Sequence, residues 1–342
     1  MARRKEIPNI QKRTSCVWEK VNRNMVKNNW MDIYDAYAYQ GNGNEKEIVN
    51  LKRDNMPEKL FRYRSLDHKN YVLEELKENY VYLSSATGFN DPFESIGILS
   101  RGEINTYLDG IEDKANLSLL KNIKEEYVLM KDMVSDFGTE CMKELQDECN
   151  HQLKIIDDKT MQFTESIVSI IGKYIDKTFR MVCFTTSNKN LPMWAHYAKN
   201  HEGVCIEYDY KNRDSMAENL NFFPIRYTKS MKNITKIISL NPKALLKVVL
   251  YILSRKQEEW SYENEWRYSV GNPLRHYSNE SHEFVIKAVY LGLNFNDSEM
   301  LNSILKYSKK SEFQVYQMKK TNQGLKPEEI EQCNFEENSV VQ

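Results

Sequence analysis

The chain has 342 residues, and its 48 lysines and arginines nearly balance its 49 aspartates and glutamates, so global charge favours neither nucleic acid nor a membrane surface as a default partner. Hydrophobic residues make up 41% of the chain, which excludes a disordered protein, and the scarcity of glycine (12) and proline (8) argues against an all-β barrel with many turns. No apolar run approaches the roughly 18 residues of a membrane span, and no secretory signal is visible. The six cysteines form no C-x-x-C pair. We therefore expect a soluble, cytoplasmic protein with reduced thiols.

The first 55 residues are typical of a polar, helical lead-in that ends at the sequence QGNGNEKE. Within them, residues 1–28 hold eight lysines and arginines against two glutamates. A basic arm of this kind suits phosphate groups, although a solvated helix explains the same composition. The arm therefore adds a nucleic acid to the partners worth testing.

The segment 56–100 predicts two strands separated by a helix. The strands are expected over 57–64 and 80–84, and the helix over 68–79. The sequence ATGFNDPFES follows, in which Asn90 and Asp91 can bond their own backbone and Pro92 suits the first turn of a helix.

Residues 101–178 interrupt this pattern with an apolar seam of helical spacing. Leu119, Ile123, Tyr127 and Met130 begin a series that recurs every three or four positions. The spacing predicts an inserted hairpin of two long helices whose seam is packing core. Such a hairpin also offers a surface for oligomerisation.

The remaining chain returns to mixed strands and helices before a polar tail, predicted to be loose, over 321–342. Strands are expected over 180–184, 203–208, 223–227, 266–270, 282–290 and 313–316, and helices over 191–200, 242–259 and 297–309. Strands from both sides of the insertion are expected to share one sheet, so 56–100 and 179–320 form one split domain. The predicted fold class is α+β, with a mixed, largely antiparallel sheet core, flanking helices and an inserted helical hairpin.

Four segments combine polar and aromatic residues more densely than a plain scaffold needs. They are FRYRSL (from Phe61), VYLSSATGFNDPFES (from Val81), MWAHYAKNHEGVCIEYD (from Met193) and WSYENEWRY (from Trp260). In this order they resemble the bacterial family called domain of unknown function 2971. The resemblance covers roughly residues 57–293 and implies kinship without an activity.

A second resemblance, to ADP-ribosyltransferases, rests on an early arginine, a serine pair and a late E-x-E. These are Arg64, then Ser84 with Ser85, then Glu263 with Glu265. The resemblance implies NAD as substrate, with Arg64 on its phosphates or ribose, a serine supporting the nicotinamide pocket, and one of the two glutamates as the catalytic carboxylate. RNA 2′-phosphotransferases share that general fold, and the opening RYRSLD is similar to theirs.

The chemistry of N-glycosidic cleavage suits these residue types. A fixed carboxylate stabilises the oxocarbenium-like transition state, and an arginine grips phosphate with two parallel hydrogen bonds. Aromatic rings at Tyr82, Trp194 or Tyr197 can stack on nicotinamide or adenine. If E-x-E lies on a strand, both carboxylates share one face, and Arg267 continues that face. A purely structural Glu–Arg ladder would use the same residues.

Three functions stay open on the sequence alone. The preferred interpretation is an NAD-dependent ADP-ribosyltransferase that modifies a protein or nucleic acid, as a bacterial toxin or anti-phage defence effector. Its catalytic residues are Glu263 and Glu265, and no metal ligand is assigned. The predicted nucleotide-binding residues are Arg64, Tyr82, Ser84, Ser85, Asn90, Asp91, Trp194, His196, Tyr197 and Arg267.

The second function is a metal-dependent nuclease or phosphodiesterase that uses Asp91, Glu94, His196 and the E-x-E pair. The third is a non-enzymatic module that senses a nucleotide or a protein through the same pocket.

Overall fold

The computed structural model describes residues 30–40, 44–91, 93, 97, 160–230, 232–235, 245–271 and 280–330. The chain divides into two compact units, Met1–Asn55 and Met56–Gln342. The basic arm predicted over 1–28, most of the predicted helical hairpin (101–159) and the end of the polar tail lie outside the described residues.

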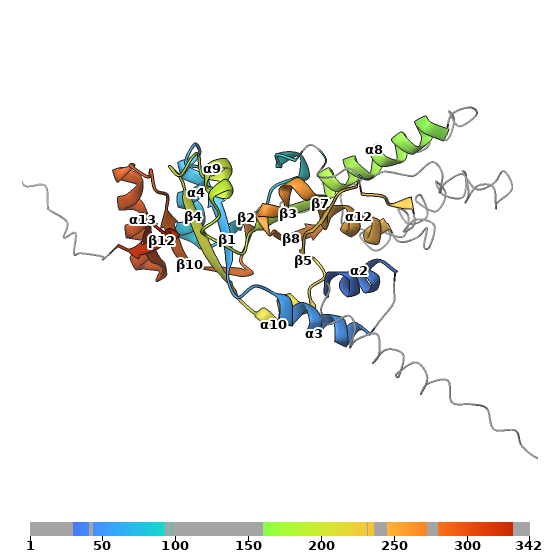
Figure 1. The fold of residues 1–342 in the computed structure, drawn as a ribbon, viewed down its shortest axis with the longest axis horizontal. Helices are drawn as coiled ribbons and strands as arrows, with labels where there is room; N and C mark the ends of the chain where they lie inside the picture. Colours follow the sequence, from blue (N-terminus) through green and yellow to red (C-terminus); the bar gives the residue numbers. More distant parts are fainter. Residues whose placement is uncertain are drawn as a thin grey trace, which may run out of the picture. The chain divides into compact units, whose positions relative to one another are not determined.

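The first unit contains helices α2 (Trp30–Gln40) and α3 (Glu45–Asn55), which pack against each other (Figure 1). In α3 the first turn carries Glu45 and Glu47 and the last turn carries Lys52 and Arg53. This order complements the helix dipole, which favours negative charge at the amino end and positive charge at the carboxyl end.

The largest sheet of the second unit has five strands in the order β1-β4-β10-β11-β12. Their bounds are β1 (Leu60–Arg64), β4 (Val204–Tyr210), β10 (Phe284–Leu291), β11 (Gln314–Thr321) and β12 (Gly324–Glu329). β10 and β11 are parallel, and the other neighbours are antiparallel. β1 precedes the insertion and β4 follows it, so strands from both sides of the insertion do pair. β12 corrects the tail predicted from residue 321, because Thr321 and Gly324 close a hairpin there.

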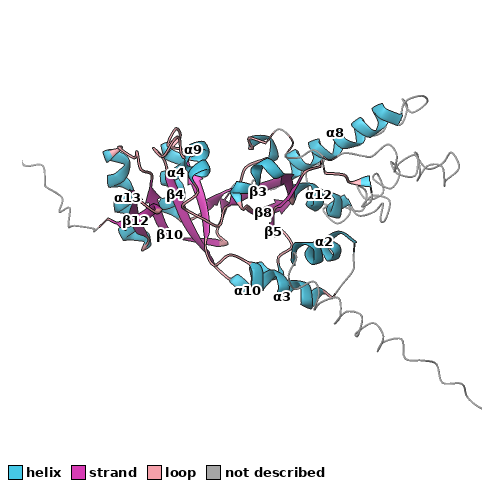
Figure 2. Ribbon diagram, in the orientation of Figure 1, coloured by secondary structure: helices cyan, strands magenta, loops and turns pink. Residues whose placement is uncertain are grey.

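Helices flank the strands in this unit (Figure 2). Helix α4 (Lys69–Glu78) contacts α13 (Ser298–Ser311), which also contacts β11, and helix α9 (Leu191–Tyr197) contacts β1. Asn79 ends α4 in the left-handed conformation, with φ of 53°. Asparagine tolerates that conformation better than most residues, so α4 stops where the next strand must begin.

A three-stranded sheet in the order β3-β8-β5 lies beside the first, built from β3 (Phe179–Phe184), β8 (Trp266–Gly271) and β5 (Phe222–Pro224). Isolated antiparallel bridges join Phe61 to Thr185 and Ser84 to Met181. The expectation of one continuous sheet is therefore wrong, because β1 and β3 meet only through a bridge and otherwise pair within different sheets. Short pairs β2 (Val81–Tyr82) with β9 (Glu280–Ser281), and β6 (Arg226–Thr228) with β7 (Arg255–Gln257), complete the described strands.

The strand predicted over 223–227 divides into β5 and β6 because the chain changes its pairing partner after Ile225, from β8 to β7. Beyond the proline, Ile225 donates to the carbonyl of Glu265 and Arg226 donates to the carbonyl of Ser254, over 2.9 and 2.8 Å. This short crossing holds the start of β8 beside the start of β7. It brings Glu265 close to Lys256, which matters for the site.

Helix α8 (Thr160–Thr178) packs against β3. Helix α12 (Leu245–Leu253) comes just before β7 in the chain, and α10 (Arg213–Glu218) follows β4. α8 matches the second helix expected in the insertion. The α+β class with largely antiparallel sheets is confirmed. Among the described residues, no helix combines the length and the apolar character that crossing a bilayer requires.

Candidate functional site

A cavity of about 450 Å³ opens beside β1 and β3, within the usual size range of small-molecule sites. Its walls come from β1, the start of α4, the turn η1 (Ala86–Gly88) after β2, β3, α9, β7 and the end of the 3₁₀ segment η2 (Glu258–Glu263). Of the predicted site residues, those that line it are Arg64, Tyr82, Ser84, Asn90, Tyr197, Glu263 and Glu265. The early arginine strand and the late acidic pair therefore do face one cavity.

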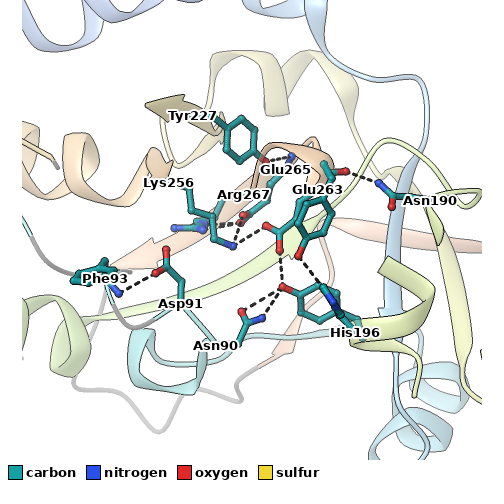
Figure 3. Close-up of polar contacts among 12 residues, drawn as sticks. Asn90, Asp91, Phe93, Asn190, His196, Tyr227, Lys256, Glu263, Glu265 and Arg267 are labelled. Atoms are coloured by element: carbon teal, nitrogen blue, oxygen red, sulfur yellow. Dashed lines mark hydrogen bonds and ion pairs between the residues drawn. The ribbon is translucent and has the colours of Figure 1, made fainter. Parts of the chain in front are cut away.

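One end of the cavity is an acidic pair bound to a buried lysine (Figure 3). Lys256 Nζ lies 2.7 Å from Glu263 Oε2 and 3.4 Å from Glu265 Oε2. All three side chains are at most 4% exposed, so their charges interact with little screening by water. Lys256 also lies over the Trp260 ring, with Nζ 4.8 Å from the ring centroid.

Glu265 binds two cations, Arg267 and Lys256, and its side chain also hydrogen-bonds with Cys183. Its Oε1 accepts from Arg267 Nε at 2.9 Å and from Arg267 Nη2 at 2.7 Å, and its backbone N–H donates to Tyr227 Oη. Burial alone would raise the pKa of Glu265, but Arg267 and Lys256 outweigh burial and hold the pKa at about 2. Glu265 is therefore ionised at neutral pH and acts as the fixed negative charge of the pair.

Glu263 behaves differently from its neighbour. Burial, reinforced by the charge of Glu265, raises the pKa of Glu263, and Lys256 and Tyr197 only partly oppose this. Its Oε1 accepts a 2.5 Å hydrogen bond from Tyr197 Oη, which itself accepts from Asn90 Nδ2 at 2.9 Å. Two nearby carboxylates with pKa values moved in opposite directions are the arrangement that lets one of them exchange protons or hydrogen-bond partners.

The local geometry of the acidic pair corrects the sequence prediction. Glu263 ends the 3₁₀ segment η2, and Asn264 is left-handed with φ of 44°, so only Glu265 leads directly into β8. The pleat of a strand therefore does not align the two carboxylates. Lys256 draws them together instead, whereas Glu265 and Arg267 do form the predicted contact two residues apart.

The other end of the cavity carries two arginines on alternate positions of β1. Arg62 Nη1 and Arg64 Nη1 both donate to Glu75 Oε1, at 2.7 and 3.2 Å. The backbone N–H of Tyr82 donates to the same oxygen at 3.0 Å. Burial and the neighbouring Arg62 lower the pKa of Arg64, as expected when two cations share one carboxylate.

The remaining predicted residues lie away from the cavity. Trp194 is completely buried, with Nε1 donating to the Asn188 carbonyl at 2.8 Å, so its predicted stacking on a nicotinamide or adenine ring is wrong. Helical spacing explains this, because Met193 and Tyr197 share the cavity face of α9 while Trp194 points into the core. Arg267 is likewise wholly buried against Glu265 and the Leu253 carbonyl, so its role is support.

Asp91, His196 and Ser85 do not line the cavity either. Asp91 Oδ1 accepts from the Phe93 N–H at 2.9 Å, the local turn chemistry that its sequence suggests. His196 Nδ1 lies 3.0 Å from Tyr262 Oη, which places the imidazole beside η2.

A metal site of the nuclease type would need several of these groups together. Within the described residues, no three His, Cys, Asp or Glu side chains gather in a way that could hold a metal ion. Glu94, the fourth member of that predicted set, lies outside the described residues.

Sequence reasoning missed three residues of the site. Lys256 falls within the helix predicted over 242–259, whereas the described helix ends at Leu253 and the lysine lies on β7. Arg62 lies two positions before Arg64 on the same predicted strand. Strand alternation places both side chains on one face, and this alone would have predicted Arg62 as a site residue. Nothing in the local sequence around Glu75 indicates that two arginines of another strand contact it.

One comparison with known proteins gives a match. Residues 193–268 match the family model described as protein of unknown function (DUF2971). The matched range runs from α9 to β8, so it contains Tyr197, Lys256 and the acidic pair but not the arginines of β1. It is shorter than the extent of 57–293 expected from the motifs. No curated protein and no solved structure matches the chain, and the resemblance to ADP-ribosyltransferases remains a prediction.

Proposed function

We propose that the cavity binds NAD and that the protein transfers its ADP-ribose to a protein or nucleic acid. One observation carries this proposal: a pair of arginines and a carboxylate with a raised pKa line the same 450 Å³ cavity. Arginine is suited to phosphate, and a carboxylate is suited to a ribose hydroxyl and to the positive charge that develops at its C1′ atom.

The reaction at the acidic end is a substitution at C1′ of the nicotinamide ribose. The C1′–N bond breaks and its electron pair leaves with nicotinamide, which neutralises the pyridinium charge. The acceptor's nucleophilic atom then forms a bond to C1′, and its proton passes to solvent. A carboxylate fixed near C1′ lowers the barrier because it is already oriented when positive charge appears there.

Glu263 is the carboxylate that fits this role. It lines the cavity at the end of η2, and its Oε1 is held by a tyrosine hydroxyl that a ribose hydroxyl can replace. Glu265 has both oxygens bound to Arg267 and Lys256, so it fixes the lysine and the backbone of the site. Glu263 is thus the catalytic residue in this proposal, and Glu265 is a positioning residue.

NAD consumption and transfer of labelled ADP-ribose test the proposal. Purified full-length protein is incubated with NAD and with candidate protein and nucleic-acid acceptors, and Glu263→Gln is compared with the unmodified chain. We expect Glu263→Gln to lower turnover by two orders of magnitude or more, in line with the loss of one transition-state electrostatic contact. Glu259→Gln is the matched control, because Glu259 is an exposed residue of the same 3₁₀ segment and lies outside the cavity.

Two results would overturn the proposal. One is turnover of NAD by Glu263→Gln at the unmodified rate. The other is no NAD consumption with any acceptor. Nucleic-acid cleavage that a chelator abolishes would then support the nuclease interpretation.

A further inference from the structure

The outer part of the cavity contains aromatic and cationic residues that the proposed reaction at Glu263 does not use. Three of its residues, His68, Tyr71 and Tyr82, are exposed aromatic side chains at the mouth, and the two arginines lie further in. Tyr71 is 60% exposed, and its ring centroid lies 5.8 Å from that of His68. Exposed aromatic rings beside a cavity offer flat faces to a planar ligand.

Glu75 connects these two features. It is fully buried, and its Oε1 accepts from both arginines and from the backbone N–H of Tyr82. Tyr71 lies four residues earlier on α4, hence on the same face of the helix. Glu75 therefore holds both arginines and the backbone of Tyr82, and Tyr71 lies one helical turn before it on α4.

The charges at this point favour an anion. The guanidinium groups of Arg62 and Arg64 share a single oxygen of Glu75, and Glu75 Oε2 has no hydrogen-bond partner within the described residues. Both arginine side chains keep 14–17% of their surface exposed where they line the cavity. Asp67, the carboxylate at the mouth, already pairs with Lys199 at 3.0 Å. Among the residues that the structure describes, the two arginines thus carry one more positive charge than their carboxylate partner neutralises, and guanidinium groups suit phosphate.

We infer that this outer part is a binding site for a nucleoside 5′-phosphate, with the base against Tyr71 and Tyr82 and the phosphate on Arg62 and Arg64. This inference rests on the proposed function and deepens it. It orients the dinucleotide with its AMP half outward and its nicotinamide ribose inward, towards Glu263.

Calorimetric titration of the full-length protein with AMP tests the inference, with adenosine and ribose 5-phosphate as ligands that lack one half of the recognition. We expect AMP to bind at least tenfold more tightly than either fragment. Arg62→Gln and Arg64→Gln should each weaken AMP binding about tenfold, and Tyr71→Ala about fivefold, since base stacking contributes on the order of 1 kcal/mol or more. Tyr71→Phe, which keeps the ring, should bind AMP more tightly than Tyr71→Ala.

Lys77→Gln is the matched control for the arginine variants, because Lys77 is an exposed cation of the same helix that pairs with Glu78 and lies outside the cavity. Tyr71 is mostly exposed, so its substitution keeps the test valid even if an arginine variant fails to fold. Equal AMP affinity in Tyr71→Ala, Lys77→Gln and the unmodified chain would overturn the inference, as would the absence of AMP binding at millimolar concentration.

Failure here and failure of the proposed function are distinguishable. AMP binding that depends on Tyr71, together with no NAD turnover, would refute the transferase and leave the binding site standing. NAD turnover whose KM is unchanged in Tyr71→Ala would refute the binding site and leave the transferase standing.

Discussion

Lys256 and Glu263 form a buried ion pair at the inner end of the cavity, with 2.7 Å between Nζ and Oε2. The lysine lies on β7 and the glutamate ends η2, seven residues later along the chain. Both side chains also reach a second partner, Glu265 for the lysine and Tyr197 for the glutamate. Lys256 therefore connects Glu265, the fixed negative charge of the site, to Glu263, the residue that we assign to catalysis.

Replacing Lys256 should destabilise the protein and shift its pH dependence in a defined direction. Lys256 lowers the pKa of Glu263, so in Lys256→Met that pKa rises further. A glutamate whose folded pKa lies above its unfolded value costs stability as pH rises through that interval. We expect a loss of about 3 kcal/mol in the free energy of unfolding at pH 8, and a smaller loss at pH 5. Urea denaturation at both pH values measures this.

Lys229→Gln is the control for that experiment, because Lys229 is 85% exposed and pairs only loosely with Glu258 at 3.8 Å. An equal loss of stability at both pH values in Lys256→Met would contradict the assigned coupling to Glu263.

Glu265→Gln should lower the free energy of unfolding at neutral pH, because the ionised Glu265 stabilises the unmodified protein there and is protonated only in acid. The pKa of Glu265 is about 2 in the fold against an ordinary value of 4.5, so its charge stabilises the fold above pH 4.5 and stops doing so as pH falls towards 2. The difference corresponds to about 3 kcal/mol. Urea denaturation should therefore show a large gap between the two proteins at pH 7 that narrows below pH 4.5. A gap that stays constant down to pH 3 would count against the ion pair as its source.

The sequence was sufficient to predict much of the fold. Short runs rich in apolar and aromatic residues predicted β1, β3, β4, β8 and β10 within a few residues of their observed bounds, and the helices α4 and α13 were predicted as closely. β4 and β8 are buried along most of their length, and helices α4 and α13 bury one face, so local pattern and tertiary environment agree. The order of the motifs also led to the correct expectation that Arg64 and the acidic pair face one cavity.

The rest of the site depends on contacts that local patterns do not encode. The apolar run before Lys256 continues smoothly into KQEE, yet the helix ends at Leu253 because Ser254 and the residues after it pair with Arg226 and the rest of β6. Tertiary pairing overrode helix propensity there. Trp194 was misassigned for a related reason: an aromatic residue in a polar motif resembles a stacking group until its helix is placed against the core.

Tyr197→Phe should separate the catalytic role of Glu263 from its structural role. The Tyr197 hydroxyl lowers the pKa of Glu263 through a 2.5 Å hydrogen bond, so its removal raises that pKa. We expect the acidic limb of the pH profile of kcat/KM for NAD to move upward, because Glu263 must be ionised to act. The free energy of unfolding should fall by only about 1 kcal/mol. An unchanged acidic limb would mean that another group controls it.

Trp194→Phe should lower the stability of the protein without changing its affinity for AMP. The indole is wholly buried, packs edge-on against Tyr63 with 5.0 Å between ring centroids, and stacks on His201 at 5.7 Å. Phenylalanine keeps part of that packing but leaves a void and deprives the Asn188 carbonyl of its donor, which together should cost about 2 kcal/mol. AMP affinity measured by calorimetry should stay within twofold, because the indole does not reach the cavity. A tenfold loss of affinity with unchanged stability would instead indicate that Trp194 contacts the ligand.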